Sequence, residues 1–150
     1  MQLKRLLFFV IIVLVGIQFI STQKNQSTKL LETDISKSFD MPTDIQKIFK
    51  TTCYDCHSNN TNYPWYNKIQ PIGYLLERHI KNGKKELNFN EFGEYSLRKQ
   101  KSKIKAIKNQ VIGNKMPLWS YTLIHKNSKL SQQQKDLIKQ WASKLLDSLN

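Results

Sequence analysis

The chain has 150 residues, the length of a single domain, and its 24 Lys and Arg against 11 Asp and Glu give a net charge of +13. This excess favours contact with acidic surfaces, such as anionic lipid, nucleic acid or an acidic protein, without distinguishing among them. Two cysteines are too few for a disulfide scaffold, and with only 5 Gly and 4 Pro the composition argues against a long disordered body. The two cysteines are three positions apart, so we expect them to take part in chemistry rather than to tie the fold together.

The N-terminus has the pattern of an export signal or a membrane anchor. Lys4 and Arg5 precede an apolar run over residues 6–17. The residues that follow are bulky where a signal peptidase needs small ones, so we predict an uncleaved signal anchor over residues 1–21, with a cleaved signal peptide as the alternative. Cations at this end place it inside the cell and the body outside. We therefore expect membrane contact through residues 4–20, and in a bacterium an inner-membrane protein whose domain faces the periplasm.

The segment after the anchor is polar and mixed in composition. Residues 22–40 are rich in Gln, Asn, Ser, Thr and Lys, and we interpret them as a tether with a short helix near residues 30–35. Residues 41–150 are predicted to form the folded domain.

The domain shows helical patterns and no convincing strand alternation. Four helices are predicted, at residues 42–52, 72–82, 96–112 and 131–149. Gly83 and Gly113 are suited to ending the second and third of these helices. Ser131 with Gln134 forms a capping-box pattern at the start of the fourth. The sequence therefore predicts an all-α fold with sizeable loops, and a cofactor that fills the core would explain the loops.

The chemistry of the chain is concentrated in one short motif, Cys53-Tyr54-Asp55-Cys56-His57. C-x-x-C-H is the attachment signature of c-type haem. On a helical turn, positions i, i+3 and i+4 share one face, so both thiols reach one edge of the porphyrin and His57 lies beneath the iron. We predict one haem c per chain, attached through Cys53 and Cys56, with His57 as the proximal iron ligand. Its attachment outside the cytoplasm agrees with the export signal.

Two other interpretations of the motif stay open. C-x-x-C alone also occurs as a thiol redox pair or as half of a zinc site. A redox pair usually precedes a helix in an α/β fold, and no strand is predicted here. A zinc site needs two more good ligands at compact spacing, whereas His79 and His125 are far away in the sequence.

The second axial ligand is predicted from a loop. Electron-carrying cytochromes c place Met opposite His, which raises the potential. Met116 lies in an interhelical loop, and Pro117 after it keeps it out of helical geometry. We predict Met116 as the distal iron ligand, with core packing as the alternative role and His125 and His79 as rival ligands.

Several blocks of the sequence resemble the bacterial haem-binding domain proteins, which are small exported cytochrome-c-like proteins. The blocks span roughly residues 44–145, and they are Cys53 to Asn60, Tyr63-Pro64-Trp65-Tyr66, Ile69-Gln70-Pro71, Gly83 to Phe89, Met116-Pro117-Leu118 with Tyr121 and His125, and Trp141. The resemblance implies haem bound through Cys53, Cys56 and His57, and it supports a functional Met116. It implies no particular substrate or partner. With the helical patterns, it predicts a small cytochrome-c-like domain wrapped around one haem.

The function expected from these features is single-electron transfer rather than enzyme catalysis. The Lys- and Arg-rich face of the helix at 96–112 would steer docking on an acidic redox partner, or is simply solvated. An exported domain rarely meets nucleic acid, and no small-molecule substrate is indicated. The alternatives are a peroxidase-like haem enzyme and a redox or ligand sensor, both of which need an open or exchangeable iron position. A weaker alternative is a thiol oxidoreductase that uses Cys53 and Cys56.

Overall fold

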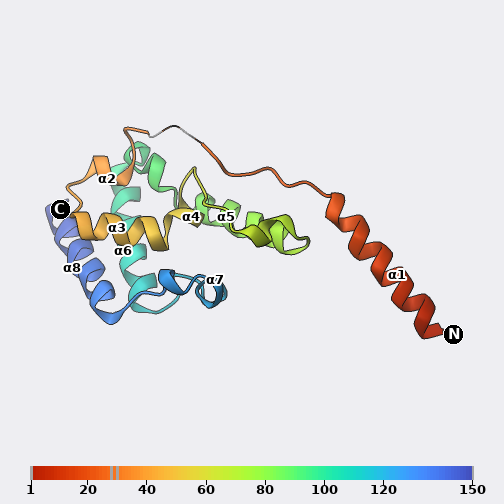
Figure 1. Cartoon of the computed structure of the whole chain (residues 1–150). Helices are drawn as coiled ribbons and strands as arrows, with labels where there is room; N and C mark the ends of the chain where they lie inside the picture. The colour runs from red at the N-terminus through yellow and green to blue at the C-terminus, as the bar shows by residue number, and fades with distance from the viewer. Residues whose placement is uncertain (1, 28, 30, 150) are drawn as a thin grey trace.

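The computed structural model of the chain describes residues 2–27, 29 and 31–149, and these residues form helices and loops without a strand. The helical fold class predicted from the sequence is therefore confirmed (Figure 1). In chain order the elements are α1 (Gln2–Gly16), η1 (Ile17–Phe19), α2 (Ile35–Ser38), α3 (Thr43–Thr52), α4 (Tyr54–His57), η2 (Trp65–Lys68), α5 (Ile72–Glu86), η3 (Phe89–Glu94), α6 (Leu97–Ile112), α7 (Trp119–Ile124), η4 (Lys126–Ser128) and α8 (Gln132–Ser148).

The four long predicted helices correspond to α3, α5, α6 and α8. The capping box at the start of α8 is present, since the Ser131 hydroxyl accepts from the Gln134 N–H and the Gln134 side chain accepts from the Ser131 N–H. Gly113 caps α6 as predicted. The predicted stop at Gly83 is wrong, because α5 continues to Glu86. Gly83 instead lies where α5 passes close to the backbone of α4 at Cys56.

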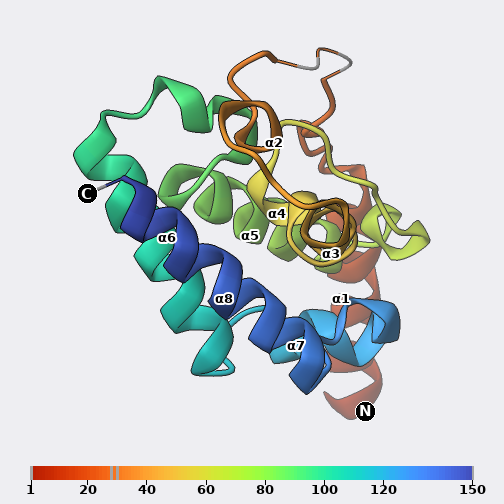
Figure 2. The same ribbon diagram turned by 90° about the vertical axis from the view of Figure 1, so that its left-hand side faces the viewer.

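The core forms where α6 and α8 pack along each other and α3 packs on α8 (Figure 2). Contacts from Lys108 to Ser143 and from Lys135 to Asn114 show that α6 and α8 run antiparallel. Each helix contributes one buried apolar stripe, as expected for an amphipathic helix. The stripes comprise Ile45, Ile48 and Phe49 of α3, Ile104 and Val111 of α6, and Ile138, Trp141 and Ala142 of α8.

The N-terminal helix α1 projects away from this body (Figure 1). Residues Gln2–Phe19 are long and apolar enough to cross a membrane, and none of them is buried in the fold. A membrane anchor and an export signal both have these properties. The apolar helix thus agrees with the predicted N-terminal segment without distinguishing its two forms.

Part of the predicted tether packs on the domain. The short helix expected near residues 30–35 is misplaced, because α2 begins at Ile35 and residues 31–34 are not helical; residue 30 lies outside the described residues. Asp34 caps α2 by accepting from the Ser36 N–H, which fixes its start. Ile35 is fully buried, and the Gly93 N–H donates to the Thr33 carbonyl at 2.7 Å, joining this segment to η3.

Candidate functional site

The Cys-x-x-Cys-His motif forms a single helical turn. Cys53 precedes α4, and its carbonyl accepts from the N–H groups of Cys56 and His57 at 3.2 and 3.0 Å. Positions i, i+3 and i+4 of such a turn share one face. Cys53, Cys56 and His57 are all half-buried, so the turn presents two thiols and one imidazole at the edge of the body.

The imidazole of His57 is held by a backbone carbonyl. Its Nδ1 lies 3.0 Å from the Leu87 oxygen, and because a carbonyl only accepts, Nδ1 carries the proton and Nε2 the lone pair in the neutral ring. Metal-ligating histidines are commonly oriented in this way. Burial lowers the pKa of His57, which keeps the ring neutral at pH 7. The Pro71 carbonyl, in the loop after the motif, instead accepts from the Leu75 N–H.

Gly83 brings α5 against this turn. A Cβ at Gly83 would lie 2.7 Å from the Cys56 carbonyl oxygen, closer than a carbon can approach. The missing side chain therefore sets the distance between the helix and the motif.

We expect Gly83→Ala to destabilise the fold by about 1–3 kcal/mol, because the added methyl overpacks a backbone contact. This cost exceeds the gain of roughly 0.5–1 kcal/mol in helix propensity. The measurement is thermal unfolding, and Asn82→Ala, at the exposed neighbouring position, is the matched control. Equal unfolding midpoints for the two variants would show that α5 is free to move.

Both thiols are poor nucleophiles in this setting. Burial, followed by the proximity of Cys56, raises the pKa of Cys53 to about 12. Burial, followed by the charge of Asp55, raises the pKa of Cys56 to about 11. Reactive and zinc-binding cysteines need the thiolate. Within the described part of the chain, no group of three or more His, Cys, Asp or Glu side chains is placed to hold a metal ion.

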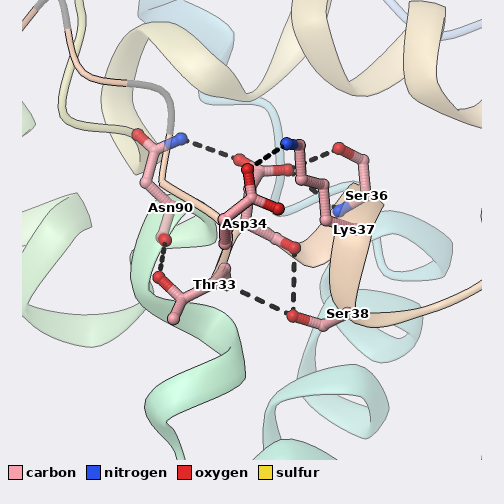
Figure 3. A network of polar contacts seen from close by, with 7 residues as sticks. Thr33, Asp34, Ser36, Lys37, Ser38 and Asn90 are labelled. Carbon is pink, nitrogen blue, oxygen red and sulfur yellow. Dashed lines mark hydrogen bonds and ion pairs between the residues drawn. The ribbon is translucent and has the colours of Figure 1, made fainter.

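A buried carboxylate, that of Asp34, fixes the motif from the tether side. Figure 3 shows Asp34 with its partners Ser36 and Asn90. Asp34, 4% exposed, accepts hydrogen bonds from the Tyr54 hydroxyl at 3.0 Å and from Asn90 Nδ2 at 2.7 Å, besides those from Ser36. Asn90 Oδ1 in turn accepts from the Asn59 N–H at 2.6 Å. Asp34 therefore reaches both ends of the motif, through Tyr54 within it and Asn59 just after it.

A second network ties α7 to the motif. The Tyr121 hydroxyl donates to Asp55 Oδ2 at 2.5 Å. The Tyr121 ring stacks on His125, with centroids 4.2 Å apart, and His125 Nε2 lies 2.6 Å from the Tyr66 hydroxyl. Burial and the charge of Asp55 raise the pKa of Tyr66, so this phenol stays protonated. His125 therefore lies beside the motif.

The other candidate ligands occupy different surroundings. Met116 is half-buried in the loop between α6 and α7, next to a cavity of about 140 Å³. Met116 is five positions before Tyr121, so its Cα lies within about 18 Å of that of Tyr121. His79 is exposed on α5, and is not a core residue.

Large apolar side chains are exposed on the two helices that adjoin the motif. They are Ile72 and Leu75 of α5, and Trp119, Leu123 and Ile124 of α7, which are 45–74% exposed. Large apolar side chains that are exposed together commonly mark a site that binds a ligand or a partner. The two thiols and oriented imidazole of the turn, with these exposed apolar side chains, are the residue types that a planar, largely apolar porphyrin needs.

Some site residues were not predicted from the sequence. Leu87, Asp34 and Asn90 hold the motif from 20 to 31 positions away. Leu87 belongs to a block that carries the family resemblance, but its contribution is a backbone atom, which its side chain does not reveal. Asp34 has a helix N-cap pattern with Ser36, the one local signal that separates it from the surrounding polar residues.

The comparisons with known proteins agree with this geometry. The model of the family described as haem-binding domain matches residues 12–144. Neither the curated proteins nor the solved structures gave a match. With the family match covering both the motif and the helices around it, the chain belongs to the haem-binding domain family.

Proposed function

We propose that the protein is a membrane-anchored, periplasm-facing cytochrome that holds one haem c and transfers single electrons. The observation that carries the proposal is the helical turn at Cys53, Cys56 and His57, with the His57 ring oriented by the Leu87 carbonyl. When bound, the haem supplies an iron that gains and loses one electron. The chain's part is to fix the cofactor, orient the imidazole and exclude water.

The two thiols are suited to attachment rather than to redox exchange. Their raised pKa values keep them as thiols. Each thiol would add across one haem vinyl group, so that the S–H bond and the C=C π bond break while a C–S and a C–H bond form, and no oxidant is needed. A thiol oxidoreductase needs a lowered thiol pKa, so the structure disfavours that alternative.

A positive surface near the motif supports an acidic redox partner. Arg98, Lys99 and Lys105 are exposed on α6. Although burial and two backbone hydrogen bonds have larger effects on the pKa of His57, the charge of Lys103, also on α6, lowers it. The cationic face of α6 therefore lies near the motif. Complementary charge speeds the encounter of two proteins more than it tightens their complex.

We propose Met116 as the distal ligand, delivered by the loop before α7. In this case the oxidised protein shows the weak long-wavelength absorption band of Met–iron ligation, and Met116→Ala loses that band and has a lower reduction potential. His79→Ala, at an exposed histidine, is the control and leaves both unchanged.

One observation favours a second candidate function. Tyr66 and His125 form a hydrogen-bonded polar pair beside the motif. Haem proteins that catalyse reactions or sense ligands at an open iron position need a polar group of this type. Carbon monoxide separates the two functions. Rapid binding of carbon monoxide to the reduced wild type at neutral pH contradicts the closed carrier and supports the open site.

A further inference from the structure

The end of the N-terminal helix is bonded to the body of the protein. Gln18 Nε2 donates to the Gln70 carbonyl at 3.0 Å, and the Gln70 N–H donates to Gln18 Oε1 at 3.0 Å. Gln70 Nε2 also donates to the Ile20 carbonyl at 3.0 Å. Figure 1 shows the turn between η2 and α5 at the end of the body that faces α1. The chain therefore leaves the apolar helix clamped to this turn.

This clamp fixes the depth of the turn relative to a membrane. The apolar segment Gln2–Phe19 has 18 residues, about 27 Å as a helix, close to the ~30 Å thickness of a bilayer core. When the segment spans the bilayer, Gln18 lies at the boundary of the hydrocarbon. Gln70, bonded to Gln18, then lies at the level of the headgroups.

The side chains around Gln70 have the composition of a membrane interface. Trp65 is 76% exposed, Tyr74 is 55% exposed, Ile69 is 42% exposed, and Lys68 is exposed beside them. We call these four residues the interfacial patch. Trp and Tyr are enriched at the headgroup level of membranes. The ammonium group of a Lys is attracted to an anionic leaflet.

We propose that the interfacial patch docks on the headgroup layer of the anionic phospholipid bilayer that α1 crosses. The proposal rests on the anchor in the proposed function, and not on the state of the haem. Docking turns a tethered domain into one of fixed orientation, with the α5 and η2 end toward the lipid. A redox partner then approaches from the remaining faces, among them the cationic face of α6.

The position of the clamp favours lipid over a protein as the occupant of the patch. Gln70 contacts Gln18 and Ile20 directly, so the patch begins within a few residues of the helix that enters the membrane. A protein partner on the patch would have to fit between the domain and the bilayer.

The test uses the full-length haem-loaded chain in nanodiscs of phosphatidylcholine and phosphatidylglycerol. Hydroxyl-radical footprinting with mass spectrometry measures the oxidation of Trp65. Leu137 of α8, which is 37% exposed and lies outside both the interfacial patch and the haem setting, is the reference in the same sample. We expect Trp65 oxidation to be several-fold slower in the wild type than in the Lys68→Glu, Ile69→Glu double variant. Leu97→Glu, an equivalent change on α6, is the matched control and keeps Trp65 protected.

The outcomes separate docking from the proposed function. Trp65 oxidation at the same rate in the wild type and the double variant overturns the docking. This holds also where Trp65 is protected in both, because something other than lipid then covers it. Loss of residues 1–21 from the mature chain overturns docking and anchor together. Protected Trp65 on a chain without covalent haem supports docking and overturns the haem attachment alone.

Discussion

We expect the Cys53→Ala, Cys56→Ala double variant to lose all haem that survives denaturation. Both thioether bonds start from these two thiols, which the turn at α4 places on one face. The chain has no other cysteine, so no second attachment is available. The measurement is haem-dependent peroxidase staining of a denaturing gel after export in cells that make c-type cytochromes.

The matched control lies between the two thiols. Tyr54→Phe keeps both cysteines and removes the hydroxyl that donates to Asp34. We expect this variant to retain covalent haem. Haem that stays with the denatured double variant would contradict attachment through Cys53 and Cys56.

The second large effect is expected at Phe89, a core residue that also contacts the motif. Phe89 is 1% exposed, and its ring centroid lies 5.2 Å from that of Phe49, 5.1 Å from that of Tyr54 and 5.8 Å from that of His57. Phe89→Ala removes all three contacts and leaves a cavity, at a cost of about 3–5 kcal/mol. The unfolding midpoint falls sharply, and the His57 ring loses one wall of its setting.

Leu97→Ala is the control for Phe89→Ala. Leu97 is a large apolar residue that is 53% exposed, so its truncation leaves no cavity. We expect a change within roughly 0.5 kcal/mol for this variant. A Phe89→Ala midpoint as close to wild type as that of Leu97→Ala would show that the core around the motif is not packed as described.

The sequence predicted what local patterns determine. The buried apolar residues of α3, α6 and α8 repeat at helical spacing, and the capping box joins Ser131 to a residue three positions away. Both features could therefore be predicted from the sequence. The motif at Cys53 is likewise local, because its chemistry depends on spacing along a single turn.

What the sequence did not predict depends on contacts between distant segments. The carbonyl that orients His57 comes from Leu87, 30 positions away. Glycine is typical of helix ends, but Gly83 instead allows α5 to approach the backbone of Cys56 closely. This requirement is evident only when both helices are in place. The polar segment around Asp34 has the composition of a tether, yet it hydrogen-bonds to Tyr54 and Asn90.

The aromatic residues show the same limit. Trp65, Tyr74 and Trp119 are large aromatic residues of a type common in cores, but all three are more than half exposed. Residue type alone does not distinguish a core aromatic from one that faces a cofactor or a membrane, because all of these settings are apolar. Their positions beside the motif and beside Gln70 separate the uses proposed above.

The most direct test of the central claim is the intact mass of the exported wild-type chain under denaturing conditions. Covalent attachment through both thiols predicts the mass of the polypeptide plus that of one haem, with no free thiol available to an alkylating reagent. A mass equal to that of the polypeptide alone, with both Cys53 and Cys56 open to alkylation, would contradict it.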